Sequence, residues 1–401
     1  MLTNVDTIVV VDIETTINAP VPHFGATPAY PGNFAVMFGY RSLFSGDHTK
    51  VTTDFREVAD AMLQGEETLL VGHNLAFDLY YLLEEAERVN DLAFLNKKFL
   101  VWDTQKFHYM ATGRSSISPS LEYVAESMAV PFKKDVEIKE RFKAGIGSDK
   151  IDRHLLADYL VGDVEVTNTI FEKQVAMCKA KGEAYFKYML QMMQGIAATT
   201  EMSRNGIRFD SPSATKEVEV MEGEQTELTT KASGKYARLW PAEAAIEFNI
   251  NSSLQVETLL WGGHVKTKRQ EIQRDEEDND IIYKTGKRAG EVKMKWETGD
   301  VLIEGLADET TKAFFIKKGW ETKGGASTLK HIQKYGSPEA KELALEIIEI
   351  RKINKSISTY FKPYIDFEID GKIHPNYNHN ITQTGRLSSS KPNMQNISGK
   401  K

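Results

Sequence analysis

Cysteine is almost absent from this sequence, in which Cys178 is the only one among 401 residues. A single thiol excludes both a disulfide framework and a zinc site built from several cysteines. Long apolar runs are also missing: the run from Ile8 to Val11 stops at Asp12, well short of the roughly 20 residues that span a bilayer. The N-terminus lacks the basic flank of a secretory signal. We therefore expect a cytoplasmic protein with no membrane partner.

Basic residues are fewer than acidic ones, so the formal net charge is −7 at pH 7. This balance argues against a protein that coats nucleic acid without specificity. Acidic residues are nevertheless absent from residues 371–401, which contain Lys372, Arg386, Lys391, Lys400 and Lys401. From charge alone, this tail is either a solvated basic end or a local contact for nucleic acid. A chain of 401 residues is too long for one compact core, so we expect two or three domains.

The first 183 residues alternate between strand and helix patterns. Short β-branched runs predict buried strands, and apolar residues three and four apart predict helices. The predicted strands are Thr7–Val11, Phe34–Tyr40 and Thr68–Val71, and the predicted helices are Leu79–Val89, Leu121–Met128 and Asp152–Phe171. This mixture predicts an α/β domain over residues 1–183.

The remaining chain is mainly helical in pattern. Helices are predicted at Ala184–Arg204, from Asp210-Ser211-Pro212 to Lys231, and at Lys341–Tyr360. The second has a thin apolar face, so we expect it to be exposed.

Residues 264–325 are irregular and heavily charged, with an acidic run at Asp275–Asp280. Two short strands, Ile281–Tyr283 and Val292–Trp296, are predicted on either side of a turn at Thr285–Lys287. We interpret residues 264–325 as a β-rich insertion in a helical domain. Its mixed charge suits a DNA contact, a protein contact or a solvated surface.

Three acidic residues follow or end predicted strands. Asp12 and Glu14 are two apart in a strand, so both point to the same face. Two neighbouring carboxylates repel each other unless a cation neutralises them, and oxygen ligands favour Mg²⁺ or Mn²⁺. Asp78 follows another strand and starts a helix, where a carboxylate also serves as an ordinary helix cap.

Tyr159 and Asp163 are four residues apart in a predicted helix, so they share a face and can touch one substrate. Two metal ions roughly 4 Å apart activate a water, hold a phosphodiester and stabilise its leaving oxygen. For this chemistry we predict Asp12 as the bridging ligand, Glu14 and Asp163 at the first ion, and Asp78 at the second. The Tyr159 hydroxyl would orient the attacking water.

Three segments around these residues resemble the motifs of DEDDy exonucleases. They are Val10-Val11-Asp12-Ile13-Glu14-Thr15, Asn74-Leu75-Ala76-Phe77-Asp78 and Tyr159-Leu160-Val161-Gly162-Asp163. Trp102-Asp103-Thr104 and Ser120-Leu121-Glu122 are similar to that family's intermediate segments. The resemblance implies a ribonuclease H-like fold, 3′-to-5′ polarity, a preference for single-stranded DNA 3′ ends, and Asn74 as a DNA contact.

The rest of the chain resembles family A DNA polymerases of bacteria and phages, except for the predicted insertion. The most specific segments are Thr384-Gly385-Arg386-Leu387-Ser388-Ser389 and Pro392-Asn393-Met394-Gln395-Asn396-Ile397. The resemblance implies a thumb at residues 184–370 and the start of a palm at 371–401. It also implies primer–template contacts from Arg386, Asn393, Gln395 and Asn396. Without it, the same segment is simply a polar turn.

No carboxylate follows Asp370, so these residues lack the acidic ligands of a polymerase palm, and we expect no DNA synthesis from them alone. The leading hypothesis is the N-terminal subunit of a split polymerase in DNA replication. It would supply proofreading, while a C-terminal polymerase chain supplies palm and fingers (in the host cytoplasm if the protein is phage-encoded). A stand-alone exonuclease with a vestigial polymerase segment is the alternative, and a non-catalytic DNA-binding or scaffold subunit is the third.

Overall fold

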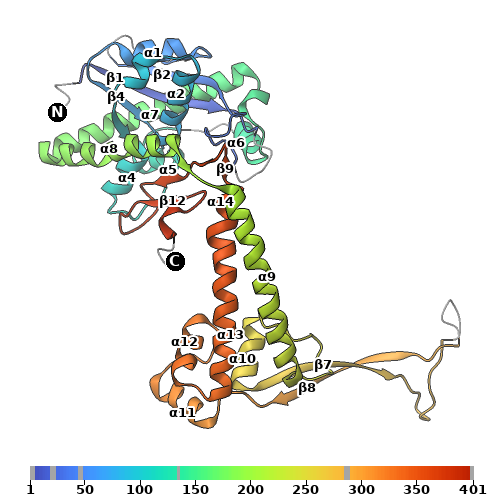
Figure 1. Cartoon of the computed structure of the whole chain (residues 1–401). Helices are drawn as coiled ribbons and strands as arrows, with labels where there is room; N and C mark the ends of the chain where they lie inside the picture. The colour runs from blue at the N-terminus through green and yellow to red at the C-terminus, as the bar shows by residue number, and fades with distance from the viewer. Residues whose placement is uncertain (1–4, 19–23, 44–47, 133–135, 284–289, 398–401) are drawn as a thin grey trace. The chain divides into compact units, whose positions relative to one another are not determined.

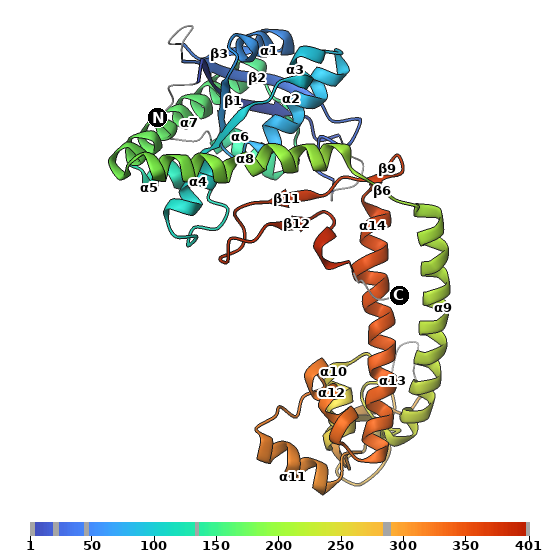
Figure 2. The same cartoon turned by 60° about the vertical axis from the view of Figure 1, so that its left-hand side comes forward.

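The computed structural model describes residues 5–18, 24–43, 48–132, 136–283 and 290–397. The chain folds into two compact units, shown from two sides in Figures 1 and 2. Unit 1 contains Met1–Ser211 and Pro363–Lys401, and unit 2 contains Pro212–Lys362. In the part of the chain that the structure describes, no helix combines the length and apolar character needed to cross a membrane.

A five-stranded mixed sheet forms the centre of unit 1. Its order is β3 (Lys50–Thr52), β2 (Ala35–Ser42), β1 (Thr7–Thr15), β4 (Thr68–Gly72) and β5 (Leu100–Asp103). The strands β1, β4 and β5 are parallel, whereas β2 runs antiparallel to both β1 and β3. The three predicted strands are confirmed. Strand β1 continues to Thr15, so it contains both Asp12 and Glu14.

Eight helices surround this sheet in the described part of unit 1 before residue 211. They are α1 (Phe55–Leu63), α2 (Ala76–Arg88), α3 (Leu92–Asn96), α4 (Thr104–Ala111), α5 (Leu121–Ser127), α6 (Val136–Lys143), α7 (Arg153–Lys181) and α8 (Glu183–Asn205). Asp54, Asp103, Ser120 and Asp152 cap α1, α4, α5 and α7 by accepting backbone N–H groups. The predicted helices are confirmed, and α7 is longer than predicted because buried Gln174 and Cys178 continue its packed side.

The C-terminal residues of unit 1 form small sheets beside α4 and α8. Strands β6 (Ile207–Arg208), β10 (Lys372–Ile373) and β9 (Glu368–Ile369) make one sheet, and β11 (Asn376–Asn378) pairs with β12 (Ser388–Ser390). Strand β6 follows α8, whereas the other four strands follow helix α14 (Lys362–Asp366). The Asn380 amide donates to Gln105, and the Tyr109 hydroxyl donates to the Thr382 carbonyl at 2.6 Å. The segment predicted to start a palm therefore packs with the predicted nuclease region.

Unit 2 has its own helical core. Its helices are α9 (Ser211–Tyr236), α10 (Ser253–Trp261), α11 (Glu309–Lys318), α12 (Ala326–Tyr335) and α13 (Pro338–Lys355), followed by a π-helical turn at Ser356–Phe361. The core includes Leu260, Phe315, Ile332 and Ile347. Helix α9 buries only Ala214, Val218, Ala232 and Tyr236 over 26 residues. The prediction that it is exposed is confirmed.

The insertion forms a long hairpin, and three residues of the predicted strand Val292–Trp296, Met294–Trp296, are confirmed as its second strand. Strand β7 (Gly263–Ile272) pairs with β8 (Met294–Ile303) over ten residue pairs. Within the described residues, Ile281–Tyr283 makes an isolated bridge, Ile282 to Val292, and backbone hydrogen bonds with Gln273 and Glu291, but it is not a strand, so that prediction was wrong. The predicted turn at 285–287 lies outside the described residues. The later part of the segment is helix α11, which buries Phe315 in the core of unit 2.

Candidate functional site

The site begins on β1, the central strand of the large sheet. Asp12 is half-buried, and the side chain of Glu14 is buried. Asp12 lies opposite Gly39 of β2, and a Cβ on Gly39 would come within 2.6 Å of Leu160 of α7. Helix α7 therefore approaches the sheet at the level of Asp12, and a side chain at position 39 would prevent this approach.

Asp78 is tied directly to β1. It lies in the first turn of α2, it is 3 % exposed, and its Oδ1 accepts a hydrogen bond of 3.1 Å from the amide of Ile13. Ile13 lies between Asp12 and Glu14, so this bond brings the segment at 78 next to both acids. Burial raises the pKa of Asp78 well above its usual value, and the charges of Asp103 and Glu14 add to that increase.

Asp103 holds the loop that precedes Asp78. Its carboxylate caps α4 through the amides of Gln105 and Lys106, and it also accepts hydrogen bonds from the amides of Asn74 and Leu75. Asn74 has a positive φ of 62°, a conformation that costs energy for most residues and that Asn tolerates. Burial raises the pKa of Asp103. We infer that Asp103 positions the loop 73–75, and thereby Asp78.

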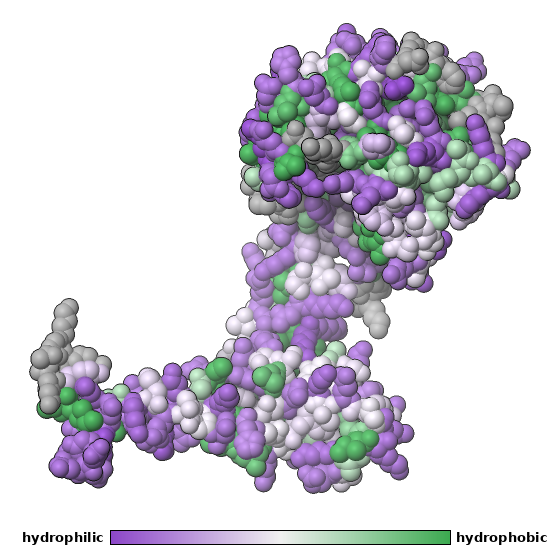
Figure 3. Space-filling model, turned by 180° about the vertical axis from the view of Figure 1, so that it is seen from behind, coloured by the Kyte–Doolittle hydropathy of each residue, from purple (hydrophilic) through white to green (hydrophobic). Residues whose placement is uncertain are grey.

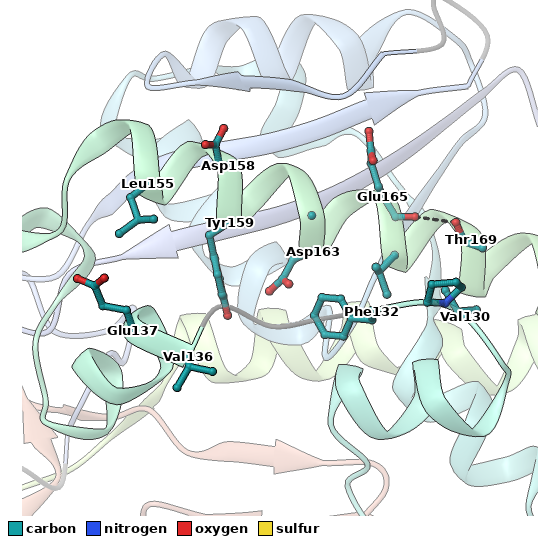
Figure 4. A pocket seen from close by; sticks show the side chains of 13 residues that line it. Val130, Phe132, Val136, Glu137, Leu155, Asp158, Tyr159, Asp163, Glu165 and Thr169 are labelled. Atoms are coloured by element: carbon teal, nitrogen blue, oxygen red, sulfur yellow. Dashed lines mark hydrogen bonds between the residues drawn. The ribbon is translucent and has the colours of Figure 1, made fainter.

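Tyr159 and Asp163 lie on the same side of α7, as their spacing predicts. Both are buried, and both line a pocket of about 890 Å³ with Val130, Phe132 and Val136. Figure 4 shows the two side chains pointing into this pocket, which Asp158 of the same helix also lines. Burial raises the pKa of Tyr159, and so do the charges of Asp163, Glu14 and Asp12 and a hydrogen bond with Asp163.

The acids that raise the pKa of Tyr159 include two from β1, so the β1 and α7 parts of the site lie close together. Asp12 and Glu14 of β1 are close enough to Tyr159 of α7 for their charges to act on it. Glu14 also faces Ser148, whose hydroxyl donates to Glu14 Oε2 at 2.8 Å. The sequence analysis did not predict Ser148, which lies in a 3₁₀ turn (Ser148–Lys150) of ordinary composition. The structure thus brings together the predicted residues of β1, α2 and α7.

In the described part of the chain, the acids that converge here do not form a complete metal-binding site. Among the described residues, no group of three or more His, Cys, Asp or Glu side chains is arranged to hold a metal ion. The donor types nevertheless suit Mg²⁺ or Mn²⁺, because carboxylate oxygens are their preferred protein ligands. Mutual repulsion of the acids is what a cation would relieve.

A second, smaller pocket of about 160 Å³ lies at Asn74. Its walls come from the start of α2, from α8 and from β11, and include Asn74, Phe77, Thr199, Tyr377 and Asn378. Amides and hydroxyls lie here beside three aromatic rings, those of Phe77, Tyr80 and Tyr377. The residue predicted as a DNA contact in the nuclease region therefore lies next to residues of the predicted palm segment.

The four other predicted DNA contacts lie on the last described residues. Arg386, Asn393, Gln395 and Asn396 are all exposed, and none of them lines either of these two pockets. Gln395 is fixed by a hydrogen bond from its amide to the Leu387 carbonyl at 3.0 Å. The Tyr364 hydroxyl donates to the Asn393 carbonyl at 2.9 Å. The segment is thus an ordered loop with polar side chains in solvent.

Comparison with known proteins shows which protein family this chain is similar to. Residues 264–401 match the family model described as DNA polymerase family A. A DNA polymerase of Bacillus phage SP01 is 23 % identical over 342 residues, which are 83 % of this chain and 34 % of that protein. DNA polymerase I of Rhizobium leguminosarum is 25 % identical over 350 residues, 84 % of this chain and 27 % of that protein.

A shorter stretch is more similar. DNA polymerase I of Lactococcus lactis subsp. cremoris is 46 % identical over 80 residues, 20 % of this chain and 9 % of that protein. The chain is therefore similar to family A DNA polymerases over most of its length. It spans about a third of the length of the phage relative.

Proposed function

We propose that unit 1 is a metal-dependent 3′-to-5′ exonuclease that removes nucleotides from single-stranded DNA 3′ ends. The observation that supports this most is the hydrogen bond from Ile13 to Asp78. It joins α2 to the part of β1 that carries Asp12 and Glu14, while Tyr159 and Asp163 face the same acids from α7. Four acids and a phenol from three elements suit phosphodiester hydrolysis. The ribonuclease H-like fold belongs to this proposal.

The four acids have distinct roles in this proposal. Asp12, the least buried of them, would bridge two ions, with Glu14 and Asp163 at the first and Asp78 at the second. Bound ions would supply an activated water and neutralise the phosphate. The hydroxyl of Tyr159 would orient the water and would not act as a base. Ser148 holds the Glu14 carboxylate through its hydroxyl.

The pocket at Asn74 suits an unpaired strand. A single-stranded base exposes both its ring face and its hydrogen-bonding edge, and aromatic and amide side chains recognise these two features. Phe77 and Tyr377 offer rings there, and Asn74 and Asn378 offer amides. We propose that this pocket holds a nucleotide near the 3′ end, so the predicted palm segment takes part in binding the exonuclease substrate.

Binding of primer–template DNA is the second part of the proposal. The similarity to family A polymerases supports it, and so does a local excess of lysine in unit 2. Residues 309–336 contain six Lys and two acidic residues, Glu309 and Glu321, which pair with Lys312 and Lys323. The remaining lysines suit contacts with phosphates. Arg386, Asn393, Gln395 and Asn396 are proposed to contact the primer–template as well.

We propose a role in DNA replication, in which synthesis needs polymerase residues beyond these 401. They have no acid after Asp370 that could bind the ions for nucleotidyl transfer. A completing C-terminal chain, as in a split polymerase, stays a prediction. Mixing the purified chain with the C-terminal part of a related polymerase tests it: primer extension that needs both chains supports the split arrangement, and its absence contradicts it.

Digestion of a 5′-labelled single strand tests the exonuclease. We expect a ladder of shortened products that requires Mg²⁺ or Mn²⁺ and disappears with EDTA. Asp12→Ala should abolish the ladder, whereas Glu126→Gln should leave it unchanged, because Glu126 of α5 is exposed and lines neither of the two pockets. Equal digestion by wild type and Asp12→Ala would contradict the proposal, as would the absence of digestion with either ion.

A further inference from the structure

The β7–β8 hairpin of unit 2 has two unlike faces. Figure 1 shows it projecting from the helices of its own unit. Paired residues of an antiparallel ribbon lie on the same face, and successive residues alternate between faces. In the observed register, even-numbered residues of 264–272 and 294–302 form one face and odd-numbered residues form the other. We call the even-numbered side the open face.

The odd-numbered side is partly covered, and its charges are paired. Val265 is buried at the base. Arg269 pairs with Glu271 at 2.5 Å, and Lys295 pairs with Glu297 at 3.0 Å. Hydrogen bonding and the charge of Lys295 lower the pKa of Glu297. This side therefore has little unsatisfied charge and few apolar groups to offer a partner.

The open face is different in exposure and chemistry. All ten of its residues are exposed, including Leu302 at 67 % and Trp296 at 57 %. The open face has one acid, Asp300, which lies directly opposite Lys266 in the register. Among the described residues neither Lys266 nor Lys268 has an acidic partner within ion-pair distance, and the Lys268 ammonium lies 4.6 Å from the centre of the Trp296 ring. On the molecular face seen in Figure 3, hydrophobic residues lie in small separate patches. Several exposed large apolar side chains beside two lysines on one ribbon are therefore a local exception that indicates a binding partner.

We propose that the open face binds single-stranded DNA, with Trp296 stacking on a base and with Lys266 and Lys268 contacting phosphates. This rests on the proposed function only for the class of ligand, and it concerns residues outside the exonuclease site. Unpaired bases expose apolar faces that Trp296, Met294 and Leu302 can cover, whereas a duplex hides them in its stack. A face that combines apolar area with positive charge therefore fits a single strand better than a double helix.

The dimensions of the ribbon agree with this ligand. Ten paired residues extend about 30 Å, which accommodates a site within the range of about 4–16 nucleotides for single-strand binders. The acidic run at Asp275–Asp280 lies beyond the paired region. Asp275 is seven residues from Lys268 in the sequence, about 20 Å along an extended strand, more than two Debye lengths at physiological salt. Arg274 also pairs with Asp278 and Asp280.

A circular oligonucleotide tests this surface independently of the nuclease, because a circle has no 3′ end. We would measure binding of a fluorescent circular oligo-dT to the full chain in EDTA by anisotropy. Trp296→Ala should weaken binding about tenfold, the loss of one stacked base. Lys266→Gln with Lys268→Gln should weaken it and reduce the salt-dependence slope by about 1.4, since each single-strand phosphate contributes about 0.7.

Lys295→Gln is the matched control, because it removes a lysine from the same ribbon on the opposite face. It should change the affinity less than twofold. Equal binding of the circle by all variants would overturn the proposal, and so would tighter binding of a circular duplex. A Trp296-dependent change in sedimentation without a change in DNA affinity would also overturn it, because the open face would then join protein chains. Asp12→Ala should lose nuclease activity and still bind the circle with unchanged affinity. The test of the open face can therefore fail or succeed independently of the test of the exonuclease site.

Discussion

The amide of Ile13 donates a hydrogen bond of 3.1 Å to the carboxylate of Asp78, 65 residues later in the chain. Ile13 has an acid on each side of it in β1, and Asp78 lies in the first turn of α2. One bond therefore sets the position of the third acid relative to the first two. Because Asp78 is buried and its pKa is raised, its charge is costly in the absence of a compensating cation.

Asp78→Asn separates the charge of this residue from its structural role. The amide oxygen can still accept the Ile13 hydrogen bond, so we expect the fold to be retained. Removing a metal ligand should reduce exonuclease kcat/KM by more than about 100-fold, beyond the 10- to 100-fold typical of residues that only orient ligands. A quantitative assay on a 5′-labelled single strand, with circular dichroism as the folding control, measures both effects. A folded variant with near wild-type activity would remove Asp78 from the metal site.

Tyr159→Phe tests whether the phenol positions the attacking water. The ring keeps its packing against Phe142, whose centre lies 6.1 Å away, so stability should change little. Loss of the hydroxyl should lower kcat by roughly 100-fold or less, because misplacing a reactant has costs of this order. The concentration of Mg²⁺ giving half-maximal activity should stay within about twofold. A large increase in that concentration would instead assign the hydroxyl to metal binding.

Gly39→Val tests the close approach of α7 to the sheet. The new side chain would collide with Leu160 beside Asp12, so we expect a loss of about 1–3 kcal/mol in unfolding free energy. Exonuclease activity should fall as well, because Tyr159 and Asp163 would move away from β1. Gly223→Ala in α9 is the matched control: a Cβ there meets nothing within 4 Å, and alanine in a helix should be neutral or stabilising by up to about 1 kcal/mol. Chemical denaturation and the nuclease assay measure both variants.

The elements that carry the candidate site follow local sequence rules, which is why they could be predicted. A β-branched run gave β1, and residues four apart gave the shared face of Tyr159 and Asp163. Ser148 and Asp103 act through contacts with residues 134 and 28–29 positions away. No local pattern encodes such distances, so neither role could be predicted from the sequence.

The insertion at residues 264–325 shows a second reason why the structure could not be fully predicted from the sequence. Strand β7 contains Lys266, Lys268 and Arg269, and its exposed face lacks the apolar alternation on which strand prediction depends. The ten-pair register with β8 decides which residues share a face. That grouping could be known only from the structure, and the proposed DNA-binding surface depends on it.

His379 gives the chain a predicted sensitivity to acid. It lies between α4 and α8, with its Nδ1 3.0 Å from the Lys106 ammonium and its Nε2 2.7 Å from the Thr199 hydroxyl. Burial, and then the charge of Lys106, lower the pKa of His379 from 6.5 to about 4. The folded chain therefore binds fewer protons than the unfolded chain between these values. The contribution of neutral, buried His379 to the unfolding free energy is fully present above pH 6.5 and is lost as the pH falls towards 4.

Protonation of His379 should lower the unfolding free energy by about 2 kcal/mol at pH 5 and by about 3 kcal/mol below pH 4, relative to neutral pH. His379→Gln cannot take up a proton, so its unfolding free energy should depend less on pH over this range by the same amounts. His48→Gln, at an exposed position of the same unit, should leave the pH dependence of the wild type unchanged. Urea denaturation at pH 7.5, 6, 5 and 4 measures all three proteins. Parallel curves for wild type and His379→Gln would mean that the packing of β11 against α4 and α8 tolerates a charged imidazole.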